Sequence, residues 1–150
     1  MCLTGAFAIP LVIDVNVVAA VAAQPSVPMS PLFAAFGLGR GAWMGELNVS
    51  QGDLTAARSR LASGQARLFA LRCHADRICP HEKIERLRRE FPMGLEVREY
   101  GAVDSRNRLG KRPHATFTKE YRLEPDASTD HPSRQAFADL VAFFDRYLRA

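Results

Sequence analysis

Residues 67–73 read Arg-Leu-Phe-Ala-Leu-Arg-Cys, a short and largely apolar run without polar–apolar alternation. Such a run is typical of a strand that is buried on both faces of a parallel sheet. The run 17–23, rich in valine and alanine, has the same character and predicts a second buried strand. The run 95–100, Leu-Glu-Val-Arg-Glu-Tyr, alternates between apolar and polar residues, which predicts a third strand nearer a sheet edge.

Helical patterns lie between and beyond these strands. The predicted helices cover residues 3–13, 53–62, 80–91 and 131–149. The first is apolar on nearly all sides, which implies burial. Asp53 is the predicted N-cap of the second helix. The predicted core face of the last helix consists of Phe137, Leu140, Val141, Phe144 and Leu148.

Strands that alternate with helices predict an α/β fold, in which helices cover both faces of a mostly parallel sheet. The chain of 150 residues suits one domain, so we treat 1–150 as a single unit. Only three strands are predicted, and no strand precedes the first helix. The sequence therefore predicts a partial three-layer domain without its N-terminal strands. The stretches 24–52, which contains the only tryptophan, and 102–130 are predicted to be mostly irregular.

The composition is that of an ordinary globular protein, with 47% hydrophobic and 24% charged residues. The net charge of +4 is modest, and no basic stripe with interleaved aromatic residues predicts nucleic-acid binding. Asp14 interrupts the apolar run 7–23 and no basic residue precedes Arg40, which argues against a signal peptide or a membrane span. Three cysteines, an odd number, favour a reducing compartment, so we expect a cytoplasmic protein.

Cys2 stands where a small loop opens directly into the first predicted helix. A nucleophile elbow has this arrangement, because it places the reactive atom on a sharp turn at a helix N-terminus. The dipole and the free N–H groups of the helix favour a thiolate there and stabilise an oxyanion. The alternative is that Cys2 is a small buried hydrophobic residue.

Asp76 follows the strand 67–73 closely. Ligands of open α/β sheets bind beyond the carboxyl ends of the strands, so an aspartate at this position is well placed to orient a histidine. The alternative is an ordinary turn residue. Two cysteines and two histidines also crowd this segment, namely Cys73, His74, Cys79 and His81. Zinc sites usually need a matching second pair elsewhere in the chain, and none is present, so we predict neither a metal nor a cofactor.

His114 lies in the loop after the third predicted strand. A histidine there is the expected general base of a hydrolytic triad, although a surface histidine is the simpler alternative. We expect His131 to start the last helix and His81 to be an exposed helix residue. The chain order Cys2, Asp76, His114 is nucleophile, acid and base, which is the order of the α/β-hydrolases.

Several segments resemble the dienelactone hydrolase family of the α/β-hydrolases. Cys-Leu-Thr-Gly-Ala-Phe-Ala at 2–8 and Val-Val-Ala-Ala-Val-Ala-Ala-Gln-Pro-Ser-Val-Pro at 17–28 are similar to that family around and after its nucleophile. Residues 71–91 look like its acid loop and the helix that follows. His114 and residues 131–144 look like its histidine loop and last helix. The resemblance covers essentially the whole chain, as a C-terminal portion that starts at the nucleophile elbow.

The resemblance implies a Cys-His-Asp triad of Cys2, His114 and Asp76, with no metal or cofactor. It also implies hydrolysis of a small-molecule ester or lactone, with the backbone N–H of Leu3 as an oxyanion donor. The chain departs from the family's Gly-x-Cys-x-x-Gly elbow, because Gly5 is present but the leading glycine would precede Met1. Ala115 also replaces a common glycine in the histidine loop.

Two alternatives belong to other functional classes. The chain is either a hydrolase or a truncated, inactive hydrolase fragment, because Met1 directly precedes the predicted nucleophile. Three strands without their neighbours would leave an apolar, unpaired edge, which is a site for association. The third hypothesis is therefore a module that forms a homo-oligomer through this edge.

Overall fold

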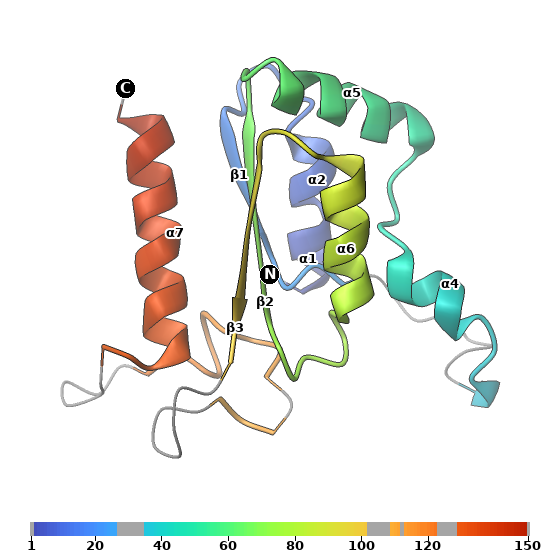
Figure 1. Ribbon diagram of the computed structural model, residues 1–150, viewed down its shortest axis with the longest axis vertical. Helices are drawn as coiled ribbons and strands as arrows, with labels where there is room; N and C mark the ends of the chain where they lie inside the picture. The colour runs from blue at the N-terminus through green and yellow to red at the C-terminus, as the bar shows by residue number, and fades with distance from the viewer. Residues whose placement is uncertain (1, 27–34, 102–108, 112, 123–128, 150) are drawn as a thin grey trace.

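The computed structural model describes residues 2–26, 35–101, 109–111, 113–122 and 129–149. Its strands form one parallel sheet in the order β1 (Ala19–Ala23), β2 (Arg67–Cys73) and β3 (Leu95–Tyr100) (Figure 1). The parallel sheet with its helices confirms the predicted α/β arrangement. Strand β1 lies within the predicted run 17–23, and β2 and β3 match the predicted runs 67–73 and 95–100.

The register places β2 at the centre of the sheet. Ala19 of β1 pairs with Arg67, and Leu68 pairs with Leu95 of β3. Every residue of β2 after Arg67 is buried, as expected for a strand covered on both faces. Strand β3 lies at one edge, which confirms the prediction from its alternating sequence. Strand β1 lies at the other edge and pairs, among the described residues, with β2 alone.

Helices cover both faces of this sheet (Figure 1). The helices on one side are α1 (Leu3–Ala6), α2 (Ala8–Leu11), α5 (Gln51–Ala62) and α6 (His81–Glu90), and α7 (Pro132–Leu148) lies on the other. Alternate side chains of β2 enter the two layers. Leu68 and Ala70 belong to the core under the first group, whereas Phe69 and Leu71 pack on the α7 side.

The predicted continuous helix over 3–13 is wrong in one respect, because it is two short helices that meet at Phe7. Pro10 has no backbone N–H, and its ring clashes with the carbonyl four residues earlier, which is where α1 ends. The segment is also not buried all round. Ile9 and Val12 are fully buried, whereas Phe7 is half exposed.

Two further boundaries differ from the sequence prediction. Asp53 is not the N-cap of α5, because the helix starts at Gln51 and the Ser50 hydroxyl accepts a hydrogen bond from the Asp53 N–H at 3.1 Å. Asp53 instead lies in the first turn, where its charge complements the helix dipole. The stretch 24–52 also contains a helix, α4 (Arg40–Gly45). Part of that stretch, 27–34, lies outside the described residues.

The predicted core face of α7 is wrong in part, because Phe144 packs against the core whereas three of the other predicted residues are exposed. Phe137, Val141 and Leu148 are 44%, 42% and 54% exposed. The buried residues of α7 are Pro132, Ser133, Ala136 and Phe143, and the Phe143 ring stacks on Phe69 with centroids 5.4 Å apart. Both stripes have helical spacing, so periodicity alone does not choose between them. The aromatic partner that β2 provides selects the second.

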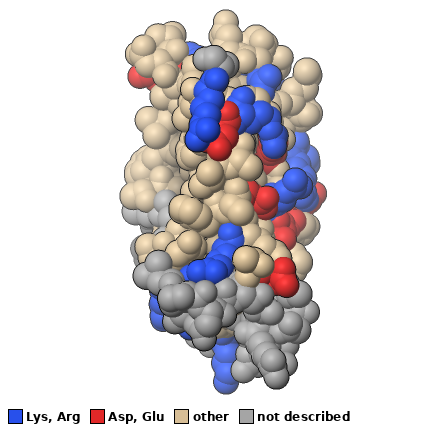
Figure 2. Space-filling view, turned by 90° about the vertical axis from the view of Figure 1, so that its left-hand side faces the viewer, with Lys and Arg blue, Asp and Glu red and all other residues tan. Residues whose placement is uncertain are grey.

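Figure 2 shows the side of the molecule on which α7 lies, and acidic and basic side chains are mixed across it. Arg146 pairs with Glu96 at 2.9 Å, and Arg149 pairs with Asp145 at the same distance. Helix α7, with 17 residues, is the longest helix among the described elements. Within the described part of the chain, no helix has both the length and the apolarity needed to cross a membrane.

Gly5 is the point at which α1 touches the end of β1. A Cβ atom at this position would lie 2.5 Å from the carbonyl oxygen of Ala23. We predict that Gly5→Ala lowers the free energy of unfolding by about 1–3 kcal/mol, the usual cost of overpacking. Urea denaturation measures this. Gly41→Ala in α4 is the matched control, because a Cβ there meets nothing within 4 Å. Equal urea midpoints for the two variants would contradict the contact.

Candidate functional site

Polar residues gather at the carboxyl edge of the sheet, where the three parallel strands end. Gln24 and Ser26 follow β1, Asp76 follows β2, and His114 lies in the chain segment after β3. Cys2, the N-cap of α1, reaches the same edge because its N–H donates a hydrogen bond to the carbonyl of Ala23 at 3.1 Å. Parallel pairing thus brings together residues that are far apart in the sequence.

Cys2 has a backbone conformation that side-chain-bearing residues rarely adopt, with φ 60° and ψ −132°. Such a conformation costs on the order of 1–3 kcal/mol and persists only where neighbours enforce it. Here the carbonyl of Cys2 accepts hydrogen bonds from the N–H groups of Gly5 at 2.9 Å and of Ser26 at 3.3 Å. The turn therefore has the sharp geometry expected of a nucleophile elbow.

The Cys2 thiol is partly buried and lies beside a hydroxyl group. Its Sγ atom is 3.4 Å from the Oγ atom of Ser26. Leu3 follows as the first residue of α1. The N–H groups of a helix's first turn have no carbonyl partner within the helix, so the backbone beside Cys2 can interact with negative charge.

Asp76 has a fully buried side chain, with 0% exposure. Its Oδ1 atom accepts hydrogen bonds from the backbone N–H groups of Ile78 at 2.9 Å and Cys79 at 3.0 Å. These contacts satisfy part of the hydrogen-bonding capacity that burial would otherwise leave unmet.

Arg72 braces the loop that carries Asp76. Its guanidinium donates to the carbonyl oxygens of Cys79 at 2.9 Å and His74 at 3.0 Å, one on each side of Asp76. Glu99 on β3 pairs with Arg72 at 2.6 Å. Burial alone would raise the pKa of Glu99, but the hydrogen bonds from Arg72 and His81 lower it. The loop is thus fixed by an ion pair between neighbouring strands.

The His114 ring lies against Asp76, with Nδ1 at 2.8 Å from Oδ2 and 2.9 Å from Oδ1. A carboxylate only accepts hydrogen bonds, so Nδ1 carries the proton and Nε2 is the basic atom of the neutral ring. Nε2 is buried and completes no ordinary hydrogen bond with the described residues.

The pKa of His114 is raised from its ordinary value of 6.5. The largest cause is the hydrogen bond to Asp76. Burial lowers the pKa, and the nearby Cys2 thiol raises it through its own interaction with the ring. The ring of His114 is thus held by Asp76 and interacts with the Cys2 thiol.

The structure therefore brings the three predicted residues Cys2, Asp76 and His114 together, with Leu3 next to the thiol. Sequence reasoning missed Gln24, which donates a hydrogen bond to Asp76, and Thr116, which donates to Gln24. One signal for Gln24 was present, because it directly follows a strand that is parallel to the strand before Asp76. Site residues of open α/β sheets lie beyond the carboxyl ends of the strands, and this rule, which predicted Asp76, also applies to Gln24.

The other cysteines and histidines have separate roles. Burial raises the pKa of Cys73 to about 11 and that of Cys79 to about 12, and no described cysteine is in a disulfide. His81 is largely exposed and pairs with Glu99, and His131 is the N-cap of α7, as predicted. No group of three or more His, Cys, Asp or Glu residues in the described ranges is arranged to hold a metal.

Helix α4 is fastened to α6 by a buried cation, Lys83. The Nζ atom of Lys83 donates to the carbonyl oxygens of Trp43 at 2.7 Å and Glu46 at 2.9 Å, and lies 4.6 Å from the centroid of the Trp43 ring. Burial lowers the pKa of Lys83 to about 8. Trp43 packs with Ala6, so α4 is held against the helix that Cys2 caps.

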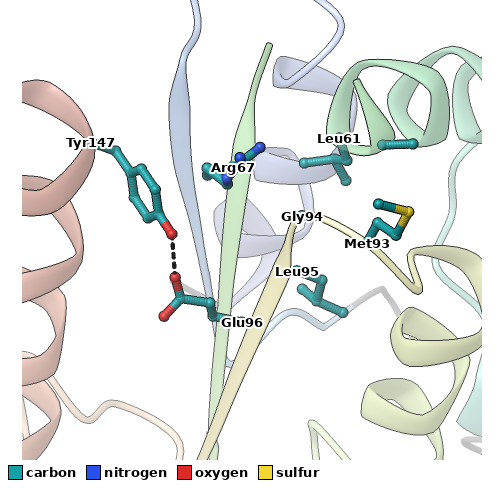
Figure 3. Close-up of a pocket in the computed structure, with 8 residues that line it drawn as sticks. Leu61, Arg67, Met93, Gly94, Leu95, Glu96 and Tyr147 are labelled. Carbon is teal, nitrogen blue, oxygen red and sulfur yellow. Dashed lines mark hydrogen bonds between the residues drawn. The ribbon is translucent and has the colours of Figure 1, made fainter. Parts of the chain in front are cut away.

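A cavity of about 230 Å³ lies at the opposite end of the sheet, at the amino ends of β2 and β3 (Figure 3). Arg67 and Met93 line it together with Tyr147, whose hydroxyl donates to Glu96 at 2.8 Å. None of the predicted site residues borders this cavity.

Comparison of the chain with protein families, curated proteins and solved structures found no match. The candidate site is therefore interpreted from its own geometry.

Removal of the negative charge at Asp76 tests the His114–Asp76 pair. We predict that Asp76→Asn lowers the pKa of His114, because the main cause of its rise disappears while the opposing effect of burial remains. The titration of the imidazole C–H resonances by NMR measures this. Asp53→Asn, at an exposed helix start, is the control and should leave the curve in place. An unchanged His114 titration in Asp76→Asn would refute the pairing.

The same pair makes stability depend on pH. The folded-state pKa of His114 lies above 6.5, so its contribution to stability is complete below pH 6.5 and is lost as the pH rises through the folded-state value. The difference in the free energy of unfolding between the wild type and Asp76→Asn should accordingly become smaller as the pH rises through that value.

Proposed function

We propose that this protein is a hydrolase of ester or lactone bonds, with an α/β-hydrolase fold that resembles the dienelactone hydrolases. The observation that carries the proposal is the position of the His114 ring. A buried carboxylate holds its Nδ1 atom at 2.8 Å, and the Cys2 thiol lies near enough to raise its pKa. The strained turn at Cys2 supports the same conclusion.

In the proposed reaction, Nε2 of His114 accepts the proton of the Cys2 thiol, and the sulfur attacks the carbonyl carbon of the substrate. A C–S bond forms, and the carbonyl electrons move to the oxygen. The backbone N–H of Leu3 stabilises this oxyanion. Asp76 keeps the ring in the Nδ1–H tautomer and stabilises the imidazolium.

The tetrahedral intermediate then breaks its C–O bond. The leaving alkoxide takes the proton from His114, and a thioester with Cys2 remains. His114 next removes a proton from water, which attacks the thioester carbon, and the sulfur leaves as a thiolate. The acid is released and Cys2 recovers its proton, so no oxidant or cofactor is consumed.

Hydrolysis of a short-chain p-nitrophenyl ester and of a simple lactone tests the proposal. Cys2→Ala should abolish turnover, and His114→Ala should lower kcat by about 10²–10⁴-fold, the usual contribution of a general base. His81→Ala, an exposed histidine on α6, is the matched control and should keep full activity. A Cys2→Ala protein that retains turnover contradicts the mechanism. A wild-type protein that is folded but hydrolyses neither substrate would favour the alternative of an inactive hydrolase fragment.

A second candidate function is self-association through the outer edge of β1. Strand β1 pairs with one neighbour among the described residues, and apolar side chains close to it are exposed. Val18 is 44% exposed and Val15 is 80% exposed. An unpaired edge strand with apolar neighbours is a template for a second copy of the chain.

Light scattering coupled to size-exclusion chromatography tests this candidate. We expect a dimer whose fraction grows with concentration and which Val18→Lys disrupts, because a lysine beside an edge strand opposes pairing. Val141→Lys, on an exposed position of α7, is the control and should leave the dimer intact. A monomer at every concentration would rule the candidate out.

A further inference from the structure

Gln24 donates a hydrogen bond to Asp76 and is fully buried, with 0% exposure. We propose that Gln24 is a positioning residue that fixes the carboxylate of Asp76 and the loop of His114 relative to each other. The inference rests on the proposed function in so far as the pair serves catalysis. The structural part of the proposal concerns only the contacts of Gln24 with Asp76 and with the segment that carries His114.

The side-chain amide of Gln24 uses all of its hydrogen-bonding capacity. Its Nε2 atom donates to Oδ2 of Asp76 at 2.8 Å and to the carbonyl oxygen of Pro113 at 3.1 Å, and it lies 3.7 Å from the sulfur of Cys73. Its Oε1 atom accepts from the backbone N–H of Thr116 at 2.9 Å and from the Thr116 hydroxyl at 2.8 Å. An amide group has two donor hydrogens and two acceptor lone pairs, so none remains for a substrate.

The contact with Thr116 fixes the orientation of the amide. A backbone N–H only donates, so the atom that faces it must be the oxygen of Gln24. The nitrogen must then face Asp76, where it presents an N–H to a carboxylate oxygen. The flipped amide would place two donors against each other at Thr116 and two acceptors at Asp76, so the network excludes it.

The same amide holds the chain on both sides of His114. Pro113 directly precedes the histidine, and Thr116 follows it by two residues. The Oδ2 atom that accepts from Gln24 is also the one 2.8 Å from Nδ1 of His114. One side chain therefore binds both the carboxylate and the segment that carries the ring, while the N–H groups of Ile78 and Cys79 hold the other carboxylate oxygen.

The backbone of Gln24 is itself constrained. Its φ of 47° lies in the left-handed region that favours glycine, and its N–H donates to the carbonyl of Leu71 at 2.7 Å. A glycine would adopt this conformation without strain but would lack the amide. Strain retained at a buried glutamine is consistent with a requirement for its side chain.

Gln24→Met is the first test variant, because methionine has a similar length but lacks the amide. The ring nitrogen shifts of His114, measured by NMR, report its tautomer and its titration. We expect the Nε2–H tautomer to grow and the pKa of His114 to fall toward 6.5, as the hydrogen bond to Asp76 loosens. The kcat for ester hydrolysis should fall by roughly 10–100-fold with little change in KM. Gln65→Met, at an exposed loop position, is the matched control.

Gln24→Glu keeps the shape of the side chain and adds a pH-dependent readout. The introduced carboxyl group donates to Asp76 while it is protonated, but repels Asp76 once it ionises. The Nδ1–H fraction of the neutral His114 ring should therefore fall as the pH rises, whereas the wild-type fraction stays constant. If Gln24 only fills space, the tautomer of His114 in Gln24→Glu should not change with pH. This second variant provides a test even where Gln24→Met fails to fold.

A folded Gln24→Met protein whose His114 tautomer and titration match the wild type overturns the proposal, as does a pH-independent tautomer in Gln24→Glu. Altered tautomers in a protein without esterase or lactonase turnover support the positioning role and count against the proposed function alone. If the wild type hydrolyses esters or lactones but neither variant alters the His114 tautomer, the proposed function is supported and the positioning role of Gln24 is overturned.

Discussion

The burial of the Asp76 carboxylate is the constraint on which the candidate site depends. A buried charge is costly unless hydrogen bonds replace its water, and here the N–H groups of Ile78 and Cys79, the amide of Gln24 and the ring of His114 do so. Each donor comes with a structural consequence. The backbone donors shape the acid loop, Gln24 ties that loop to the end of β1, and His114 is drawn onto the sheet edge with Nε2 directed away from the acid.

The parallel sheet makes this convergence possible. Strands β1 and β2 end side by side, so that Gln24 and Asp76 meet although 52 residues separate them. The N-terminal turn joins the same edge through the hydrogen bond from Cys2 to Ala23, and the absence of a side chain at Gly5 lets α1 approach. The edge therefore combines a thiol, a basic ring nitrogen and a buried acid. The cavity beside Tyr147 lies at the other end of the strands and is a separate feature.

Local patterns in the sequence predicted the strands, the amphipathic helix α6 and the positions of Asp76 and His114 after strand ends. They did not predict the break at Phe7, because the effect of Pro10 depends on a carbonyl in the previous turn. They placed Phe144 correctly on the core side of α7 but missed Phe143, whose ring stacks on Phe69, because two apolar stripes were available in the sequence. Gln24 was missed because its role arises from contacts with Asp76 and Thr116 that only the folded chain creates. The hydrolytic chemistry and the resemblance to dienelactone hydrolases stay predictions.

The rate of iodoacetamide alkylation at about pH 6, mapped to each cysteine by mass spectrometry, reports whether the His114–Asp76 pair activates the Cys2 thiol. Cys73 and Cys79 are internal controls, because burial raises the pKa of their thiols to about 11 and about 12 and keeps them slow. We expect fast labelling of Cys2 alone, and the loss of this fast labelling in His114→Ala. Slow and unselective labelling, or fast labelling of Cys2 that persists without His114, would contradict a thiol activated by the His114–Asp76 pair.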